Sequence, residues 1–388
     1  MTWRRRLKRR LLWAGVLFGL VLLYVTVSTL RAYVWAREAS RRRLVRHHYP
    51  REESSLKTRR VLSLSGLLAV ALAALVGIAG ATAAGGPPLP RPANGAKVTV
   101  LARGLPLPVG VAVGKGTVFV AGFGSEDGST PGGLFAVRRG VVHQVAGGMF
   151  LGVTWHAGTL YANRFDPPQR STILALHGWN GRSFATRKAI RHARVGLLGL
   201  AVGPDGRLYT GGGTEDCDLC AQKSRLAQAV LSMRRDGSDL RVVARGLRQP
   251  FGLAFARGVR HPFVTVEGRE GLGRRQPPDY VVVARPGEDY GFKRCTWAKP
   301  SACAGFAKPF ALLPAHSSPT GIAAIGRGLY IGMFNGTRGP AVWRLPVTGG
   351  AWQEVVSGFP APVVGVASSG RTLFASDLTG TVYRIADQ

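Results

Sequence analysis

The four cysteines of this sequence fall into two close pairs, a spacing that points to sulfur chemistry. Cys217 and Cys220 form a C-x-x-C pair, and Cys295 lies a short way before Cys303. A C-x-x-C pair is compatible with a redox motif, half of a zinc site or a tight disulfide. Neither pair has a histidine or a further cysteine beside it at zinc spacing. We therefore predict two structural disulfides, which indicate an oxidising compartment, and the redox and zinc alternatives remain open.

Other polar residues fit structural positions. His156, which follows Trp155, and His261 are interpreted as strand or turn residues without a chemical role. The steps Asp205-Gly206 and Asp236-Gly237 predict hairpin turns, because this dipeptide tolerates the left-handed backbone that tight turns require. These turns lead to the elements that must position any site.

A recurring pattern predicts those elements. Six times, a glycine followed by small or apolar residues precedes a short run rich in Tyr, Phe and Val, a pattern typical of a strand, a turn and a second strand. A third strand and usually a fourth follow. Units that recur every ~40 to 50 residues and cannot bury both faces alone pack radially as propeller blades. The anchoring glycines are Gly110, Gly152, Gly199, Gly252, Gly321 and Gly365.

The two ends of the repeat region complement each other. The sixth unit ends at its third strand, while an unpaired strand over residues 96–104 precedes the first unit. Pairing the two would close the ring and remove two exposed edges. The predicted fold class is therefore all-β, a six-bladed β-propeller over residues 92–388, with a β-sandwich or two small sheets as the alternative.

Residues 1–91 are different in kind. Two apolar runs, residues 11–30 and 61–84, are flanked by arginines and lysines and precede a linker rich in Gly and Pro. The second run is typical of a secretory signal, and its Arg59-Arg60 pair also fits a twin-arginine motif. The first fits a transmembrane helix, and the alternative is that residues 1–55 are translated from a start site placed too far upstream. We predict a targeting or membrane-anchor region here, with the propeller extracytoplasmic, either released or tethered to the membrane.

The formal net charge of +32 raises the question of nucleic acid. Residues 1–60 account for +13 of it, outside the predicted propeller, and the remaining arginines are scattered without interleaved aromatics. The composition favours a general attraction to anionic surfaces and argues against specific DNA or RNA binding.

From residue 197 onward the sequence resembles the glucose/sorbosone dehydrogenase family, and its sorbosone dehydrogenase-like branch in particular. The segments that carry the resemblance are LGLAVGPDGRLYTGGGTEDCDLC, GLRQPFGLAF, DYVVVARPGEDYGFKRC, LPAHSSPTGIA and SGRTLFASDLTGTVYRI. Proteins of that family are soluble quinoproteins built as six-bladed propellers, which oxidise sugars with pyrroloquinoline quinone (PQQ) and Ca²⁺. The resemblance implies that fold and a sugar or related small ligand at the mouth of the channel.

The resemblance also implies a set of binding residues. Arg248, followed by Gln249, matches the arginine that faces the quinone oxygens, because a guanidinium fork binds carboxylates bidentately. Glu267, Gly268 and Arg269 match the calcium-binding loop, with main-chain oxygens expected from Gly268 and Arg269, and Asp279 follows them. The alternative for Arg248 is a loop arginine that binds backbone carbonyls.

The matching position for the catalytic base holds Val195, which cannot accept a proton. His192 is the nearest substitute along the chain, and His316 matches a histidine of the sorbosone-like branch. His316 also fits a structural role in its loop.

Three functions follow from these observations. The first is an exported PQQ-dependent sugar dehydrogenase. The second is a propeller of the same descent that has lost hydride chemistry and binds a ligand or partner, which Val195 favours. The third, a calcium-dependent lactonase, needs more convergent carboxylates than the sequence offers.

Overall fold

The computed structural model describes residues 88–386, with gaps at 126–128, 169, 216, 271 and 273–275. All of these residues belong to one compact unit, Leu67–Gln388. Both apolar runs of the N-terminal region lie outside the described residues, so the predicted anchor and signal stay predictions. Among the described residues, no helix has the length and apolar character needed to cross a membrane.

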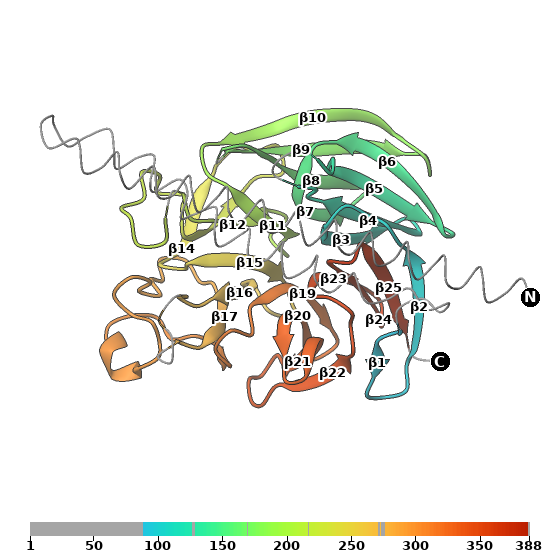
Figure 1. The fold of residues 1–388 in the computed structure, drawn as a ribbon. Helices are drawn as coiled ribbons and strands as arrows, with labels where there is room; N and C mark the ends of the chain where they lie inside the picture. Colours follow the sequence, from blue (N-terminus) through green and yellow to red (C-terminus); the bar gives the residue numbers. More distant parts are fainter. Residues whose placement is uncertain are drawn as a thin grey trace, which may run out of the picture. The chain divides into compact units, whose positions relative to one another are not determined.

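The described strands form six sheets arranged as a ring, and the six-bladed propeller is confirmed (Figure 1). The first blade contains β3 (Pro108–Gly114), β4 (Thr117–Gly122), β5 (Gly133–Arg138) and β6 (Val141–Gly147). The second contains β7 (Met149–His156), β8 (Thr159–Asp166), β9 (Arg170–Trp179) and β10 (Phe184–Ala193). The third contains β11 (Leu197–Val202), β12 (Leu208–Gly212), β13 (Ala229–Met233) and β14 (Arg241–Arg245).

The other three blades follow in chain order. The fourth contains β15 (Gln249–Ala254), β16 (Phe263–Glu267), β17 (Asp279–Val283) and β18 (Ala311–Leu313). The fifth contains β19 (Pro319–Ile325), β20 (Gly328–Gly336), β21 (Gly339–Pro346) and β22 (Gln353–Ser357), with β1 (Arg91–Pro92) added at its edge. The sixth contains β23 (Val363–Ser369), β24 (Thr372–Asp377), β25 (Thr381–Ala386) and β2 (Lys97–Ala102).

The predicted closure of the ring is confirmed. Strand β2 pairs antiparallel with β25, from Lys97 opposite Ala386 to Ala102 opposite Val382. The last blade is thus completed by the first long strand of the described chain. The pairing covers one edge of β25 and gives β2 a partner.

The six anchoring glycines share one structural role. Each lies on the first, innermost strand of its blade, beside a shift in the register of pairing with the second strand. An ideal Cβ on Gly152 would lie 2.9 Å from the Cα of Gly199, and one on Gly252 would lie 3.0 Å from the Cα of Gly321. Glycine is required there because the backbones of neighbouring blades approach too closely for any side chain.

Hydroxyl groups on the inner strands join successive blades. Thr265 on β16 donates to the Thr320 carbonyl of the next blade at 2.5 Å and accepts from the Gly252 amide at 2.8 Å. Ser376 on β24 donates to the Pro108 carbonyl at 2.7 Å, across the closure of the ring. The backbone groups freed by the register shifts therefore find partners.

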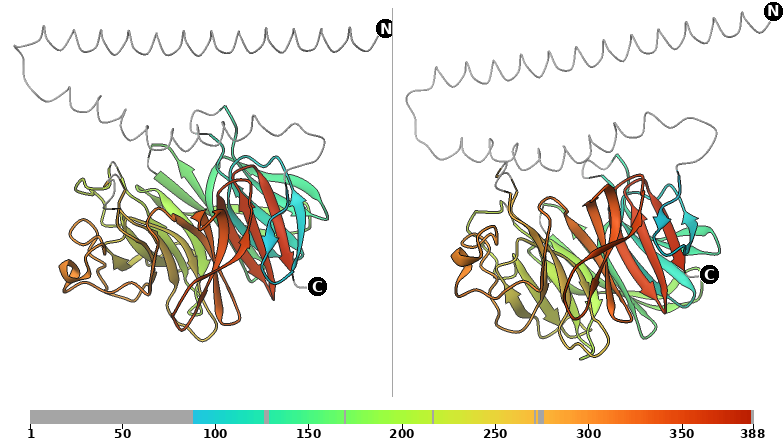
Figure 2. Two further views of the ribbon diagram at one scale, coloured as in Figure 1. Left: turned by 60° about the horizontal axis from the view of Figure 1, so that its bottom comes forward. Right: turned by 90° about the horizontal axis from the view of Figure 1, so that it is seen from below.

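The core consists of one apolar cluster between each pair of neighbouring blades. Second strands such as β4 are buried along their whole length, because both faces of a blade pack against neighbours. Outer strands such as β10 are mostly exposed and polar. Figure 2 shows the sheets standing side by side around the ring.

The fourth blade departs from the predicted pattern. Its fourth strand is β18, not the segment directly after β17. The intervening residues instead run beside β14 of the third blade, where the Arg245 amide donates to the Glu288 carbonyl and the Tyr290 amide donates to the Arg245 carbonyl. A 3₁₀ turn, Pro300–Cys303, follows.

Candidate functional site

The residues that the resemblance singles out lie on one face of the propeller. Within a blade successive strands run antiparallel, so the connections from second to third strand and from fourth strand to the next blade share one face. We call this the loop face, and the opposite face the turn face. Arg248 precedes β15, Glu267 ends β16, Asp279 begins β17 and Ser318 precedes β19, so all four lie on the loop face.

Arg248 is enclosed by acidic groups. Its guanidinium donates to Asp218 at 2.5 Å through Nε, and to Glu267 at 3.0 Å through Nη1. The same Nη1 donates to the Gly268 carbonyl at 2.7 Å, and Nη2 lies 3.6 Å from Glu270. Arg248 is only 8% exposed. Nε and Nη1 are therefore hydrogen-bonded within the protein, and Nη2 faces a protein carboxylate.

Asp279 joins two loops beneath this cluster. It is buried, and one carboxyl oxygen accepts from the Gly268 amide at 2.6 Å. The other accepts from the Ser318 amide at 2.8 Å and from the Ser317 hydroxyl at 3.1 Å. Burial raises the pKa of Asp279, while these three hydrogen bonds oppose the rise. Asp279 thus fixes the loop that carries Glu267 against the entry to the fifth blade.

Glu267 has the most perturbed carboxyl group at the site. Burial raises its pKa to about 7, with nearby Glu270 and Asp279 acting in the same direction and Arg248 opposing them. Its side chain is still 28% exposed. A carboxyl group that titrates near neutral pH at a partly open position is able to exchange a proton with a bound molecule.

The third blade supplies Asp218 through a crosslinked loop. Both predicted disulfides are confirmed, Cys217 with Cys220 and Cys295 with Cys303. Asp218 lies between the first pair, and the Gln228 side chain donates to its carbonyl at 2.9 Å. Thr214 donates to the Arg248 carbonyl at 3.1 Å, which ties the same loop to the arginine.

The structure does not bring His192 to this cluster. His192 lies on β10, the outermost strand of the second blade, where its Nδ1 is 3.0 Å from the Thr172 hydroxyl. Thr172 in turn donates to Asp166 at 2.7 Å. Val195 is fully buried in the apolar cluster between the second and third blades, so the position matched to the base offers no polar side-chain atom.

His316 and Gln249 lie closer to the cluster. His316 precedes Ser317, is exposed, and has a left-handed backbone with φ of 61°. Its carbonyl accepts from the Asn335 side chain at 2.8 Å, which fits the structural role. Gln249 begins β15 directly after Arg248 and is half-buried.

Arg269 keeps its main chain within the protein. Its carbonyl, one of the two expected to bind calcium, accepts from the Gln276 side chain at 2.5 Å. The other, from Gly268, accepts from Arg248. Both predicted main-chain ligands therefore already have donors.

These contacts disfavour the binding of PQQ that the resemblance implies. Two of the three nitrogens of the Arg248 fork already donate to protein groups, and the third faces Glu270, so a quinone carboxylate would have to compete with these partners. Three carboxyl groups, Asp218, Glu267 and Glu270, stand around the arginine, so the cluster repels a multiply anionic cofactor. In the part of the chain that the structure describes, no three His, Cys, Asp or Glu side chains are grouped to hold a metal ion.

Sequence reasoning missed two acidic partners of Arg248, Asp218 and Glu270. Asp218 lies inside the C-x-x-C pair, where the cysteines dominate the pattern, and Glu270 directly follows the loop matched to calcium. A signal was present in the sequence, since both carboxylates stand in connections that the repeat places on the same face as Arg248.

Comparison of the sequence with protein-family models gave no match, and comparison with curated proteins gave none. Solved structures do match. An oxidoreductase from Thermus thermophilus, described as a glucose dehydrogenase, is 22% identical over 75% of this chain and 100% of that chain, with a TM-score of 0.60.

Two further structures are similar. A calcium structure of a Trichoderma reesei enzyme of carbohydrate-active family AA12 is 15% identical over 80% of this chain and 100% of its own, with a TM-score of 0.61. A gluconolactonase from Xanthomonas campestris is 17% identical over 78% of this chain and 96% of its own, with a TM-score of 0.51. These likenesses confirm that the chain has the propeller fold of glucose dehydrogenases, as the resemblance implied.

Proposed function

We propose that this chain is an exported propeller of sugar dehydrogenase type that binds a sugar or related polyhydroxylated molecule at the loop face. We propose further that it acts as a binding protein and not as a PQQ-dependent dehydrogenase. The observation that carries the proposal is the ion-pair cluster of Arg248 with Asp218, Glu267 and Glu270. It occupies the positions where the resemblance implies quinone and calcium.

The chemistry of the cluster favours a neutral polyol. Glu267 and Glu270 are 28% and 50% exposed, so their carboxylates are open to solvent on one side. Adjacent hydroxyls of a sugar donate two hydrogen bonds to one carboxylate, whereas an anion meets repulsion there. Hydrogen bonds to charged groups contribute about 1.5–3 kcal/mol each, enough for recognition without a metal.

Export is supported by the two disulfides, which persist in oxidising compartments. The dehydrogenase and lactonase titles of similar structures support the sugar class of ligand, as an analogy of fold.

The experiment separates binding from redox chemistry. The full chain is incubated with PQQ and Ca²⁺, then assayed for quinone uptake by absorbance and for dye reduction with a panel of aldoses. We expect neither quinone uptake nor sugar-dependent dye reduction. Quinone uptake at micromolar concentration with sugar-dependent dye reduction would overturn the proposal.

Binding is measured in parallel by calorimetric titration of the same sugars. We expect at least one neutral sugar to bind, and Glu270→Gln to weaken it about tenfold by removing a charged acceptor. Asp236→Asn, a carboxyl in a hairpin on the turn face, is the matched control and leaves affinity unchanged. The absence of binding by every sugar would contradict the proposal.

A further inference from the structure

The turn face carries a shallow cavity, widely open to solvent, with a volume of about 720 Å³, and none of its lining residues belongs to the loop-face cluster. His156 and Val202, which end β7 and β11, line it together with the turn that follows β15 and with Ala324 near the end of β19. The innermost strands of the second, third and fifth blades contribute, and the fourth blade contributes the turn after its innermost strand. Since these strands begin at the loop face, the cavity lies at the opposite end of the ring's axis.

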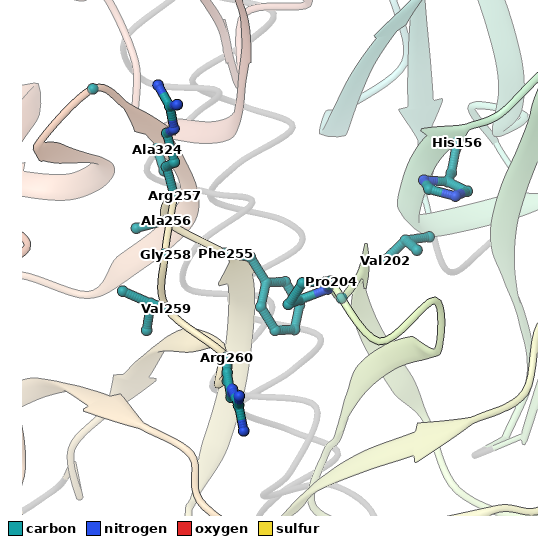
Figure 3. A pocket seen from close by; sticks show the side chains of 12 residues that line it. His156, Val202, Pro204, Phe255, Ala256, Arg257, Gly258, Val259, Arg260 and Ala324 are labelled. Carbon is teal, nitrogen blue, oxygen red and sulfur yellow. The ribbon is translucent and has the colours of Figure 1, made fainter.

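The middle of the cavity is apolar. Phe255 and Pro204 lie at the centre of the lining in Figure 3, with Val202 to one side and Val259 to the other. Phe255 is half-buried and packs edge-on against Tyr209 with ring centroids 5.1 Å apart. This contact fixes the ring and leaves part of it open to the cavity.

The charged residues of the described lining are two arginines. Arg257 and Arg260 are exposed, and within the described ranges no ion pair or hydrogen bond engages either guanidinium. No aspartate or glutamate is among the described residues that line the cavity. By contrast, Arg207 in the neighbouring cavity donates to Asp239 at 2.9 Å. An anion that enters the first cavity therefore meets two cations without having to displace a protein carboxylate.

His156 adds a neutral polar group. Burial lowers its pKa, and the nearby Arg235 lowers it further. The ring is uncharged at neutral pH, so it presents one N–H donor and one acceptor nitrogen to the cavity. Figure 3 shows it across the lining from Arg257 and Arg260.

We propose that this cavity is a binding site for a small organic anion with an apolar body, such as an aromatic carboxylate, sulfonate or phosphate ester. Arg257 and Arg260 point away from each other in Figure 3, and their exposed side chains turn towards the cavity to hold the anionic head, because guanidinium forks match planar and tetrahedral oxyanions. Phe255, Pro204 and Val259 cover the body. The volume lies within the range of small-molecule sites, which combine an apolar lining with a few polar groups. The site does not depend on the function proposed for the loop face.

The test compares a charged and a neutral probe of the same shape. Naphthalene-2-sulfonate and naphthalene-2-sulfonamide are titrated into the full chain by isothermal calorimetry. We expect the sulfonate to bind to one site at least ~10-fold more tightly than the sulfonamide. Raising the salt concentration is expected to narrow that difference, because exposed charges are screened.

Variants locate the site. Arg257→Gln with Arg260→Gln is expected to remove the preference for the sulfonate, and Val259→Asp to weaken it ~10-fold by placing a carboxylate in the lining. Arg139→Gln with Arg182→Gln removes two exposed arginines from other turns of the same face and leaves the preference intact. Thermal unfolding of each variant checks that it is folded.

Three results would overturn the proposal: no binding of the sulfonate, equal binding of both probes, or an equal loss of preference in the two double variants. Glu270→Gln on the loop face is expected to leave sulfonate binding unchanged. A negative sulfonate titration would therefore contradict the turn-face site alone, and a negative sugar titration the loop-face function alone.

Discussion

Arg248 stands between Asp218, Glu267 and Glu270, so a variant without its charge leaves these carboxylates facing one another. We predict that Arg248→Met lowers the free energy of unfolding by about 3 kcal/mol, since breaking a buried ion pair strands the partner charges. Urea unfolding at neutral pH measures it.

Arg245→Met is the matched control for this change. Its ion pair with Asp289 is exposed, with 71% of the arginine side chain accessible, and pairs of that kind contribute under about 1 kcal/mol. Equal effects of the two substitutions would contradict the role assigned to Arg248.

Glu267 should make stability depend on pH. Below its ordinary pKa of 4.5 the carboxyl is protonated in both the folded and unfolded states. Between 4.5 and about 7 the unfolded chain releases the proton while the folded chain keeps it, so stability falls as pH rises through this window. We predict that Glu267→Gln flattens this fall, which is worth roughly 1–3 kcal/mol in the wild type.

The measurement is a series of urea midpoints across this pH window, extended to either side of it. Glu354→Gln, outside the loop-face cluster, serves as the control and should retain the wild-type slope. An unchanged slope in Glu267→Gln would show that another group is responsible.

Individual residues of the site were only partly predictable from sequence. The resemblance identified Arg248, Glu267 and Gly268, and the structure places them in direct contact. The ion-pair cluster that these contacts belong to was not predictable, because it is completed by Glu270 and by Asp218, which lies in the loop between β12 and β13. Arg248 was matched to the quinone and Glu267 with Gly268 to calcium, but the structure shows Arg248 donating hydrogen bonds to Glu267 and to the Gly268 carbonyl.

The packing of the six innermost strands against one another depends on the glycine that each of them carries where neighbouring blades meet. We predict that Gly199→Ala lowers the free energy of unfolding by about 2–3 kcal/mol, because its Cβ would lie 2.5 Å from the Phe251 carbonyl oxygen. Chemical denaturation measures the loss.

Gly147→Ala provides the comparison. It lies on the outer strand β6, where the nearest atom to an added Cβ is 3.9 Å away and φ is not in the left-handed region. We expect a change within ~0.5 kcal/mol. A similar cost at both positions would argue against the close approach as the cause.

The same glycines explain why the element order was predictable. A residue type forced by close approach repeats at the same place in each blade, and the sequence displays that regularity. The segment after Val283 lacks such a constraint. It crosses to β14 of another blade before returning as β18, guided by long-range contacts of Tyr290 and Phe292 that leave no local periodicity.

At the level of the whole molecule, closure rests on β2. We predict that a chain shortened to begin at Ala93 unfolds at nearly the same temperature as the full domain, whereas one that begins at Gly104 and lacks β2 melts roughly 10 °C or more lower and tends to aggregate. Differential scanning calorimetry with light scattering reports both.

A single cooperative transition of unaltered midpoint in the shorter chain would contradict this role for β2. The longer chain controls for the loss of residues 1–92, which include β1 and its two-residue pairing with β22.

Because the ring closes only when β25 pairs with β2, it stays open during translation until β25 has left the ribosome. A polypeptide that cannot complete its tertiary structure early can still pass unfolded through a translocation pore, so on the proposed route of export the ring would close after transport. The pairing that seals the ring would thereby also time maturation relative to transport.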